Sequence, residues 1–296
     1  MNNYTYGSEI EAADWDTRKE LPEGSTLDKL DYTIVNSSGL ANCPKKQMNV
    51  YGGEVNTRVA DSPEDAVDAM MDVYNAIAPY TFNYTCNLHI HVGIPDLAND
   101  LDALKRVIQY IRKHERELYD EVLPAIPRPD KADKPAMKRF RQRNKSHRHT
   151  ISETIYQEKM AATTVEEFRA AHGVYKNGKF AAFNAIRCGV NTNSLWKSGT
   201  VEFRHFTASD DPAQLLWCFE WCKHFLDCAL NRPEVSPLML LEELGGVFNM
   251  AEFLPFDYKM DEIFQLTHFD KSSRKVREER YAQLLNDGVI TRGDFE

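Results

Sequence analysis

The chain has 296 residues, of which 42% are hydrophobic and 27% charged, a composition typical of folded globular proteins rather than disordered ones. Acidic residues exceed basic ones, and the formal net charge of −9 argues against a surface built for general polyanion binding. No apolar run approaches the ~20 residues of a membrane span, and residues 1–6 lack the basic start and apolar stretch of a signal peptide, so we expect a cytoplasmic protein without membrane association.

Segments in which polar and apolar residues alternate predict half-buried β-strands along most of the chain. The predicted strands cover residues 4–13, 31–35, 49–58, 84–94, 184–191 and 199–206.

Helix signals lie between these strands and after the last of them. Ser62-Pro63 predicts a capped helix start, and an amphipathic pattern predicts a longer helix over residues 100–123. Thr164 begins a capping box whose helix would stop near Gly173. The other predicted helices are an aromatic one from Asp211 to about Leu230, with buried, reduced Cys218 and Cys222, and three over residues 236–244, 260–266 and 272–285.

This order of elements predicts an α+β fold with an antiparallel sheet. Residues 1–230 are expected to form one core, and residues 231–296 a helical C-terminal extension packed on that core.

Several predicted strands carry ionisable residues two positions apart, and such residues project from the same face of a strand. The pairs are Glu9 with Glu11, His89 with His91, and Glu202 with Arg204, and Glu54, Asn56 and Arg58 repeat the spacing on a fourth strand. Neighbouring strands would gather all of them on one sheet face.

Four carboxylates on one face repel one another unless cations lie among them. Ligands that are mostly oxygen, with one imidazole, suit Mg²⁺ or Mn²⁺ better than a structural zinc site. An arginine beside a metal-binding carboxylate suits a phosphoryl group in transfer. Each pair alone is also consistent with an ordinary solvated strand face or ion pair, and the combination on matching faces is what favours a site.

Three of these motifs together resemble the amidoligase family, a branch of the carboxylate–amine ligases related to glutamine synthetase and glutamate–cysteine ligase. They are Gly7-x-Glu9-x-Glu11, Cys86-x-x-His89-x-His91 and Thr200-x-Glu202-Phe203-Arg204, in the family's order. The resemblance implies a curved antiparallel sheet, like a partial barrel with helices on its outer face, whose concave face holds ATP and divalent metal. It also implies a reaction in which a carboxylate is activated as an acyl phosphate and an amine converts it to an amide.

The resemblance also assigns roles to individual residues. Glu9, Glu11 and Glu202 match the acidic metal ligands of the family, His89 matches its histidine ligand, and Glu54 matches a further glutamate. His91 would contact the nucleotide phosphates and Arg204 the transferring phosphoryl group. Arg58, from its place on the same strand face as Glu54, is expected to be an additional nucleotide contact.

Two positions depart from the family pattern. Asn87 stands where relatives usually have glycine, and its side chain is expected to narrow the approach of nucleotide or substrate. Asn36-Ser37-Ser38 stands where relatives tend to show Asp-Gly-Ser, which puts a substrate contact from that turn in doubt.

Residues 131–150 concentrate lysine and arginine, in contrast to the acidic chain as a whole. One interpretation is a solvated helix or loop. The other is a lid or rim that contacts ATP or a polyanionic substrate, although Phe140 alone gives little support for base stacking.

The leading hypothesis is therefore an ATP- and Mg²⁺-dependent ligase, with Mn²⁺ as the alternative ion, acting on a small-molecule or peptide carboxylate and an amine. A zinc-dependent hydrolase using His89 and His91 and an inactive binding protein with a ligase fold are the alternatives. Related ligases range from small assemblies to large rings, so an oligomer is compatible with this hypothesis.

Overall fold

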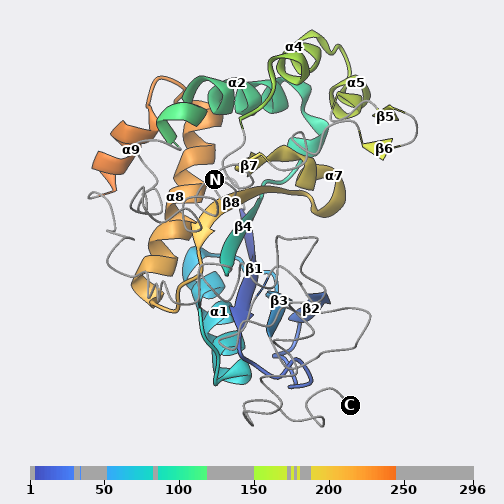
Figure 1. The fold of residues 1–296 in the computed structure, drawn as a ribbon. Helices are drawn as coiled ribbons and strands as arrows, with labels where there is room; N and C mark the ends of the chain where they lie inside the picture. The colour runs from blue at the N-terminus through green and yellow to red at the C-terminus, as the bar shows by residue number, and fades with distance from the viewer. Residues whose placement is uncertain are drawn as a thin grey trace, which may run out of the picture.

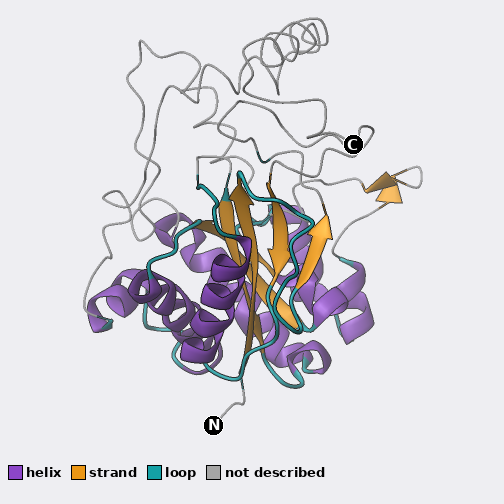
Figure 2. Ribbon diagram, turned by 90° about the horizontal axis from the view of Figure 1, so that it is seen from below, coloured by secondary structure: helices purple, strands orange, loops and turns teal. Residues whose placement is uncertain are grey.

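The structure is a computed structural model that describes residues 4–29, 34, 52–82, 86–118, 150–171, 175–176, 179–180 and 188–244. Its centre is a six-stranded antiparallel sheet with the strand order β2-β3-β1-β4-β8-β7 (Figure 1). The sheet is twisted and does not close into a barrel, and helices lie beside it (Figure 2). The predicted α+β class with a curved antiparallel sheet is confirmed.

The central strands agree with the alternation of polar and apolar residues. The strands of the sheet are β1 (Thr5–Ala13), β2 (Thr26–Lys29), β3 (Gly52–Asn56), β4 (Asn87–Gly93), β7 (Val190–Asn191) and β8 (Thr200–Thr207). A separate hairpin pairs β5 (Tyr175–Lys176) with β6 (Lys179–Phe180). Strands β2, β5 and β6 are not predicted by the sequence pattern, because each has at most four residues and too few positions to show a period.

Most helices begin where the capping residues predict. The helices are α1 (Pro63–Ile77), α2 (Leu101–Glu117), α4 (Glu153–Ala161), α5 (Val165–Ala170), α7 (Leu195–Ser198), α8 (Pro212–Asn231) and α9 (Pro237–Glu243), with short 3-10 turns η2 (Leu97–Asn99) and η4 (Thr192–Ser194). The hydroxyl of Ser62 accepts the N–H of Asp65, and the carboxylate of Asp211 accepts the N–H groups of Ala213 and Gln214. These bonds satisfy N–H groups that a helix start otherwise leaves unpaired. Helix α4 is not predicted, because it lacks an apolar stripe.

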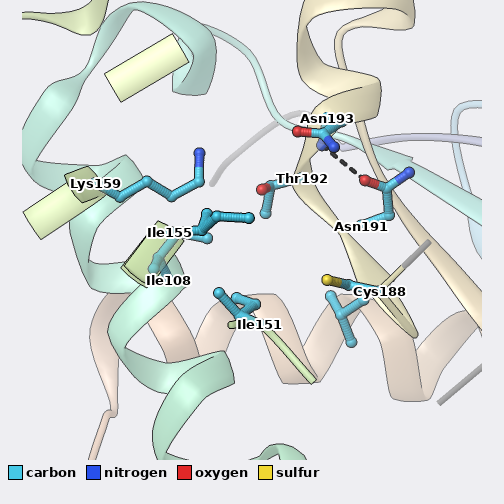
Figure 3. A pocket seen from close by; sticks show the side chains of 9 residues that line it. Ile108, Ile151, Ile155, Lys159, Cys188, Asn191, Thr192 and Asn193 are labelled. Atoms are coloured by element: carbon cyan, nitrogen blue, oxygen red, sulfur yellow. Dashed lines mark hydrogen bonds between the residues drawn. The ribbon is translucent and has the colours of Figure 1, made fainter. Parts of the chain in front are cut away.

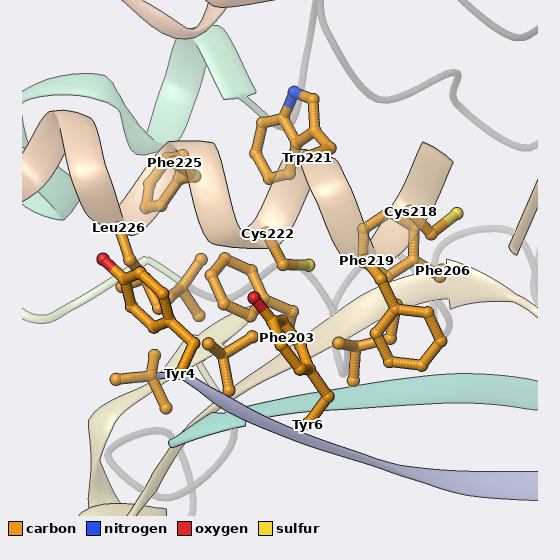
Figure 4. Close-up of a cluster of buried hydrophobic side chains, with 14 of the residues drawn as sticks. Tyr4, Tyr6, Phe203, Phe206, Cys218, Phe219, Trp221, Cys222, Phe225 and Leu226 are labelled. Carbon is orange, nitrogen blue, oxygen red and sulfur yellow. The ribbon is translucent and has the colours of Figure 1, made fainter. Parts of the chain in front are cut away.

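The hydrophobic core lies between the sheet and helix α8. Trp221 and Phe225 of α8 pack edge-to-face on Phe203 of β8, with ring centroids 6.2 and 5.6 Å away (Figure 4). All three side chains are fully buried, and each large apolar side chain removed from water contributes roughly 2 kcal/mol. Helices α1 and α2 pack beside α8, so one face of the sheet is covered by helices.

One irregularity in β8 decides which of its side chains reach this core. Leu88 of β4 pairs with Phe206, whereas Ile90 pairs with Phe203, so β8 has one more residue than β4 in this stretch. Such a bulge breaks strict alternation. Without the bulge, Phe206 would lie on the same face as Glu202. With it, the Phe206 ring packs against Trp221 of α8, and the two ring centroids are 6.4 Å apart. The bulge therefore gives the apolar face an additional aromatic residue.

A glycine sets the start of β3. Gly52 has φ of 99°, and a Cβ atom there would lie 2.1 Å from the carbonyl oxygen of Ala12 in β1. Only glycine adopts this backbone readily and allows so close an approach. This pairing fixes the register of β3 against β1, and with it the position of Glu54.

Some sequence predictions fall outside the described residues. These are the strand over 31–35 apart from Ile34, the turn at 36–38, most of the strand over 184–191, the basic segment 131–149 and the helices over 260–266 and 272–285. In the described part, Cys218 and Cys222 are buried free thiols as predicted, and burial raises the pKa of each. None of the described helices combines the length and apolar character needed to cross a bilayer.

Candidate functional site

Strand register brings the predicted ionisable residues together on the face of the sheet opposite α8. Glu9 of β1 is directly opposite His89 of β4, and His91 of β4 is directly opposite Glu202 of β8. Residues directly opposite each other in an antiparallel pair project to the same side with Cβ atoms about 5 Å apart. Three consecutive strands, β1, β4 and β8, thus form the centre of the site.

Glu9 lies between the two imidazoles. Its Oε2 atom is 2.7 Å from Nδ1 of His89, and its Oε1 atom is 3.2 Å from Nε2 of His91. Burial raises the pKa of the Glu9 carboxyl, but the hydrogen bonds from His89 and His91 outweigh that effect and hold the pKa well below its ordinary range. Glu9 is therefore an ionised carboxylate at neutral pH.

Glu202 is more deeply buried and is surrounded by donors. Its Oε1 atom contacts the guanidinium of Arg204, and its Oε2 atom accepts hydrogen bonds from Asn191 Nδ2 at 2.7 Å and Ser194 Oγ at 2.9 Å. Burial raises the pKa of this carboxyl, whereas the charges of Arg204 and the two imidazoles lower it below the ordinary value, and the lowering dominates. Glu202 is also ionised at neutral pH.

These contacts bring together a set of metal-binding atoms. Glu9, His91 and Glu202 each offer one ligand atom, and the three atoms lie within 4.8 Å of one another. The second ring nitrogen of His91, Nδ1, is 2.9 Å from the Thr200 hydroxyl. A hydrogen bond of this kind fixes the ring orientation of a metal-binding histidine, so that Nε2 faces the site. Two carboxylates and one oriented imidazole fit a divalent cation.

A second pair of acids lies beside this centre. Glu11 of β1 is directly opposite Glu54 of β3, and both side chains are buried. Asn87, the first residue of β4, donates two hydrogen bonds to Glu11 Oε2, from its backbone N at 2.8 Å and from its Nδ2 at 2.6 Å. The Asn87 side chain is thus directed to a carboxylate of the site. The structure thus gives Asn87 a contact that the sequence analysis did not anticipate. Its expected effect on the approach of nucleotide stays a prediction.

Arg58 is not brought into the site. It lies two residues beyond the end of β3, and its guanidinium donates to both carboxylate oxygens of Asp65 in α1, with NH1 to Oδ2 at 3.0 Å. This ion pair tethers the β3–α1 connection. Arg204 is the arginine that contacts the site carboxylates.

Sequence reasoning did not identify four of the polar residues that hold the site together. They are Asn191, Ser194, Thr200 and, in the role seen here, Asn87. Asn87 and Thr200 stand within or beside the recognised motifs, so strand register would have suggested them. Asn191 and Ser194 reach Glu202 through the turn after β7, which no motif marks.

A small pocket lies next to Asn191, near the edge of the sheet (Figure 3). It is small and partly open to solvent, and Ile108, Ile151 and Ile155 form much of its lining. Lys159 of α4 also lines it, and burial lowers the pKa of this amine to about 7. Asn191 lines this pocket and also donates to Glu202, so the pocket is a neighbour of the site and not its centre.

Comparison with known proteins adds one finding. The model of a family described as "Putative amidoligase enzyme" matches residues 8–226, which include each of the ionisable residues discussed above. No curated protein and no solved structure matches the chain.

Proposed function

The chain belongs to the amidoligase family of amide-bond-forming ligases, and from this premise we propose that it is an ATP-dependent carboxylate–amine ligase. In the proposed reaction a carboxylate oxygen bonds to the γ-phosphorus of ATP and ADP leaves. The nitrogen of an amine then bonds to the acyl carbon, inorganic phosphate leaves, and the nitrogen loses a proton.

One observation carries this proposal: the convergence of Glu9, His91 and Glu202 beside Arg204. Carboxylate oxygens with one imidazole are donors that suit Mg²⁺ or Mn²⁺. When bound, such ions neutralise phosphate oxygens and stabilise the charge that develops during phosphoryl transfer. We propose Glu9, His91 and Glu202 as ligands of one ion and Glu11 and Glu54 as further ligands for a second ion. The role of His89 as the histidine ligand, which the family resemblance implies, stays a prediction.

Arg204 and His91 are proposed to contact the nucleotide. The guanidinium of Arg204 is held beside Glu202, where it is available to neutralise charge on the transferring phosphoryl group. His91 is oriented by Thr200 toward the same space, so it serves either as a ligand of the ion or as a donor to the phosphates. None of these roles requires a protein nucleophile, because positioning and electrostatics supply the catalysis.

The substrates are proposed to be a small-molecule or peptide carboxylate and an amine. An acidic pocket vacated by one of the ions would attract an ammonium group, which suits the approach of an amine substrate.

The zinc-hydrolase alternative requires His89 and His91 on one ion. Within the described residues, the group of converging ligand atoms combines His91 with two carboxylates, and His89 Nδ1 is directed to Glu9. This donor set favours the magnesium-dependent ligase.

The test is calorimetric titration of the purified protein with ATP, with Mg²⁺ present and with Mg²⁺ chelated. We expect binding that requires Mg²⁺ and that is lost in Glu202→Gln, which keeps the shape of the side chain but removes the negative charge from the centre. With carboxylate and amine pairs screened for ADP release, turnover of Glu202→Gln should fall by about a thousandfold, the size of effect seen when a major electrostatic group of an active site is removed.

Glu166→Gln, the same substitution on the exposed face of α5, is the matched control and should bind and turn over normally. Near-normal turnover in Glu202→Gln would contradict the assignment of that residue. Tight binding of zinc without any Mg²⁺-dependent nucleotide binding would instead support the hydrolase.

A further inference from the structure

Two carboxylates of the site share an unusual arrangement of hydrogen bonds. In each, a single oxygen accepts two donors, and in each an asparagine amide is one of the donors. The carboxylates are Glu11, held by Asn87, and Glu202, held by Asn191 and Ser194. We refer to these two arrangements as the amide clamps.

The first amide clamp is built from one residue. The backbone N and the side-chain Nδ2 of Asn87 both point to Glu11 Oε2, at 2.8 and 2.6 Å, and the two residues are at least nine-tenths buried. Because the start of β4 is paired with β1 and β8, the backbone donor cannot be moved without disturbing the sheet. The position of Glu11 Oε2 is therefore fixed by the fold.

The second amide clamp is built from the turn after β7. Asn191 Oδ1 accepts the backbone N–H of Asn193 at 2.9 Å (Figure 3), so the orientation of the amide is set. Its Nδ2 then donates to Glu202 Oε2. Ser194 Oγ adds the second donor at 2.9 Å to the same Oε2 atom. All three clamp side chains, Asn191, Ser194 and Glu202, are buried.

Glu9 shows the contrasting arrangement. Its two oxygens are divided between two imidazoles, Oε2 toward His89 and Oε1 toward His91. Neither oxygen is held by two amide or hydroxyl donors. Within one site, the buried acids Glu11 and Glu202 thus differ from Glu9 in the way their oxygens are engaged.

The difference matters for cation binding. A carboxylate oxygen has two lone pairs, and two donors occupy both of them. A carboxylate whose Oε2 is occupied in this way can give a cation only its Oε1 atom unless a buried hydrogen bond is broken, and in Glu202 that atom is the one beside the Arg204 guanidinium. Mg²⁺ and Mn²⁺ accept such one-oxygen ligands in a compact octahedral shell, whereas Ca²⁺ is larger and often takes both oxygens of a carboxylate.

We propose that Asn87, Asn191 and Ser194 are specificity-determining residues that hold Glu11 and Glu202 as one-oxygen ligands and thereby favour Mg²⁺-sized cations over Ca²⁺. This inference rests on the proposed function, because it takes Glu11 and Glu202 as metal ligands. The three residues position the ligands and do not themselves contact substrate.

The experiment measures the dissociation constants of Mg²⁺ and Ca²⁺ by calorimetry, in the presence of ATP, for the full chain and its variants. Asn87→Ala removes the side-chain donor to Glu11 and keeps the backbone donor. Ser194→Ala removes one donor to Glu202 and leaves Asn191 and its turn in place. Asn75→Ala, on the exposed face of α1, is the matched control.

We expect Mg²⁺ affinity to fall about tenfold in Asn87→Ala and in Ser194→Ala, as is typical when a residue that orients a metal ligand is lost. Ca²⁺ affinity should fall less or rise, so that the preference for Mg²⁺ narrows, and Asn75→Ala should behave like the original chain. Thermal melts of each variant verify folding, and if Asn87→Ala does not fold, Ser194→Ala decides the result.

An unchanged ratio of Mg²⁺ to Ca²⁺ affinity in folded variants would overturn this inference and leave the proposed function intact. Failure of the unmodified chain to bind either cation with ATP would overturn both. The two failures are therefore distinguishable in one data set.

Discussion

The two faces of the sheet use the same strands for opposite purposes. On one face, β8 presents Phe203 and Phe206 to the aromatic helix α8, and on the other it presents Glu202 and Arg204 to the site. The apolar face stabilises the fold through burial. The polar face collects buried charges, whose desolvation opposes folding unless partners compensate.

The pKa shifts of buried ionisable groups differ between the polar face and the apolar core. On the polar face, partners overcome burial and keep Glu9 and Glu202 in the charged form. Lys159 of α4, whose amine donates to the carbonyl of Phe168 in α5, has a pKa lowered to about 7 because burial disfavours its charged form. The site therefore owes its charge to specific hydrogen bonds and ion pairs rather than to exposure to water.

The largest expected effect is on the apolar face. Trp221→Ala removes a fully buried ring that contacts Phe203, Phe206 and Phe225, and should lower the free energy of unfolding by about 3–5 kcal/mol. Urea unfolding followed by circular dichroism measures it. Met239→Ala, at a half-exposed position on α9, should change stability by less than about 0.5 kcal/mol. Equal effects of the two substitutions would show that α8 does not stabilise the sheet.

The second prediction concerns the buried lysine. Because the folded state binds the Lys159 proton with a pKa of about 7 and the unfolded state with an ordinary lysine pKa, the folded state gains stability as pH rises between these values. Lys159→Met lacks this titration. The free energy of unfolding of Lys159→Met, minus that of the original chain, should therefore decrease by roughly 1 kcal/mol per pH unit from pH 7 to pH 10.

Urea unfolding at several pH values measures this difference. Comparison with the variant cancels the other groups that titrate in this range, among them Cys188 in the same pocket, whose thiol pKa burial raises to about 12. A difference between the two proteins that does not vary with pH would contradict the burial of a titrating amine.

The smallest expected effect is the acid dependence of the polar face. The pKa of Glu9 is lower in the folded state than in the unfolded chain, so its contribution to stability is present above the unfolded value of about 4.3 and is lost as pH falls below it. Glu9→Gln removes this contribution. The stability of the original chain should thus approach that of Glu9→Gln under acidic conditions.

Thermal melts from pH 7 to pH 3 test this prediction. A gap between the two proteins that stays constant over that range would mean that Glu9 is not held ionised by His89 and His91. Glu64→Gln, an exposed acid in the first turn of α1, controls for the general effect of removing one negative charge.

Much of the site could be predicted because its motifs lie on strands. Alternation along a strand places residues at positions i and i+2 on one face whatever the rest of the fold does. That rule placed Glu9 with Glu11 and His89 with His91, and the strand register then joined them as expected. The same rule does not extend past a strand end, and Arg58, beyond β3, pairs with Asp65 instead.

The sequence by itself determined the α+β class, the central strands, the capped helix starts and the face that carries the acids. Those features follow from local periodicity and from side-chain hydrogen bonds within a few residues. The tertiary structure alone decided the bulge in β8, the donors Asn191 and Ser194 on Glu202, and the direction of Asn87 toward Glu11. These depend on contacts between segments distant in the chain or on a shift of register, and neither leaves a periodic pattern in the sequence.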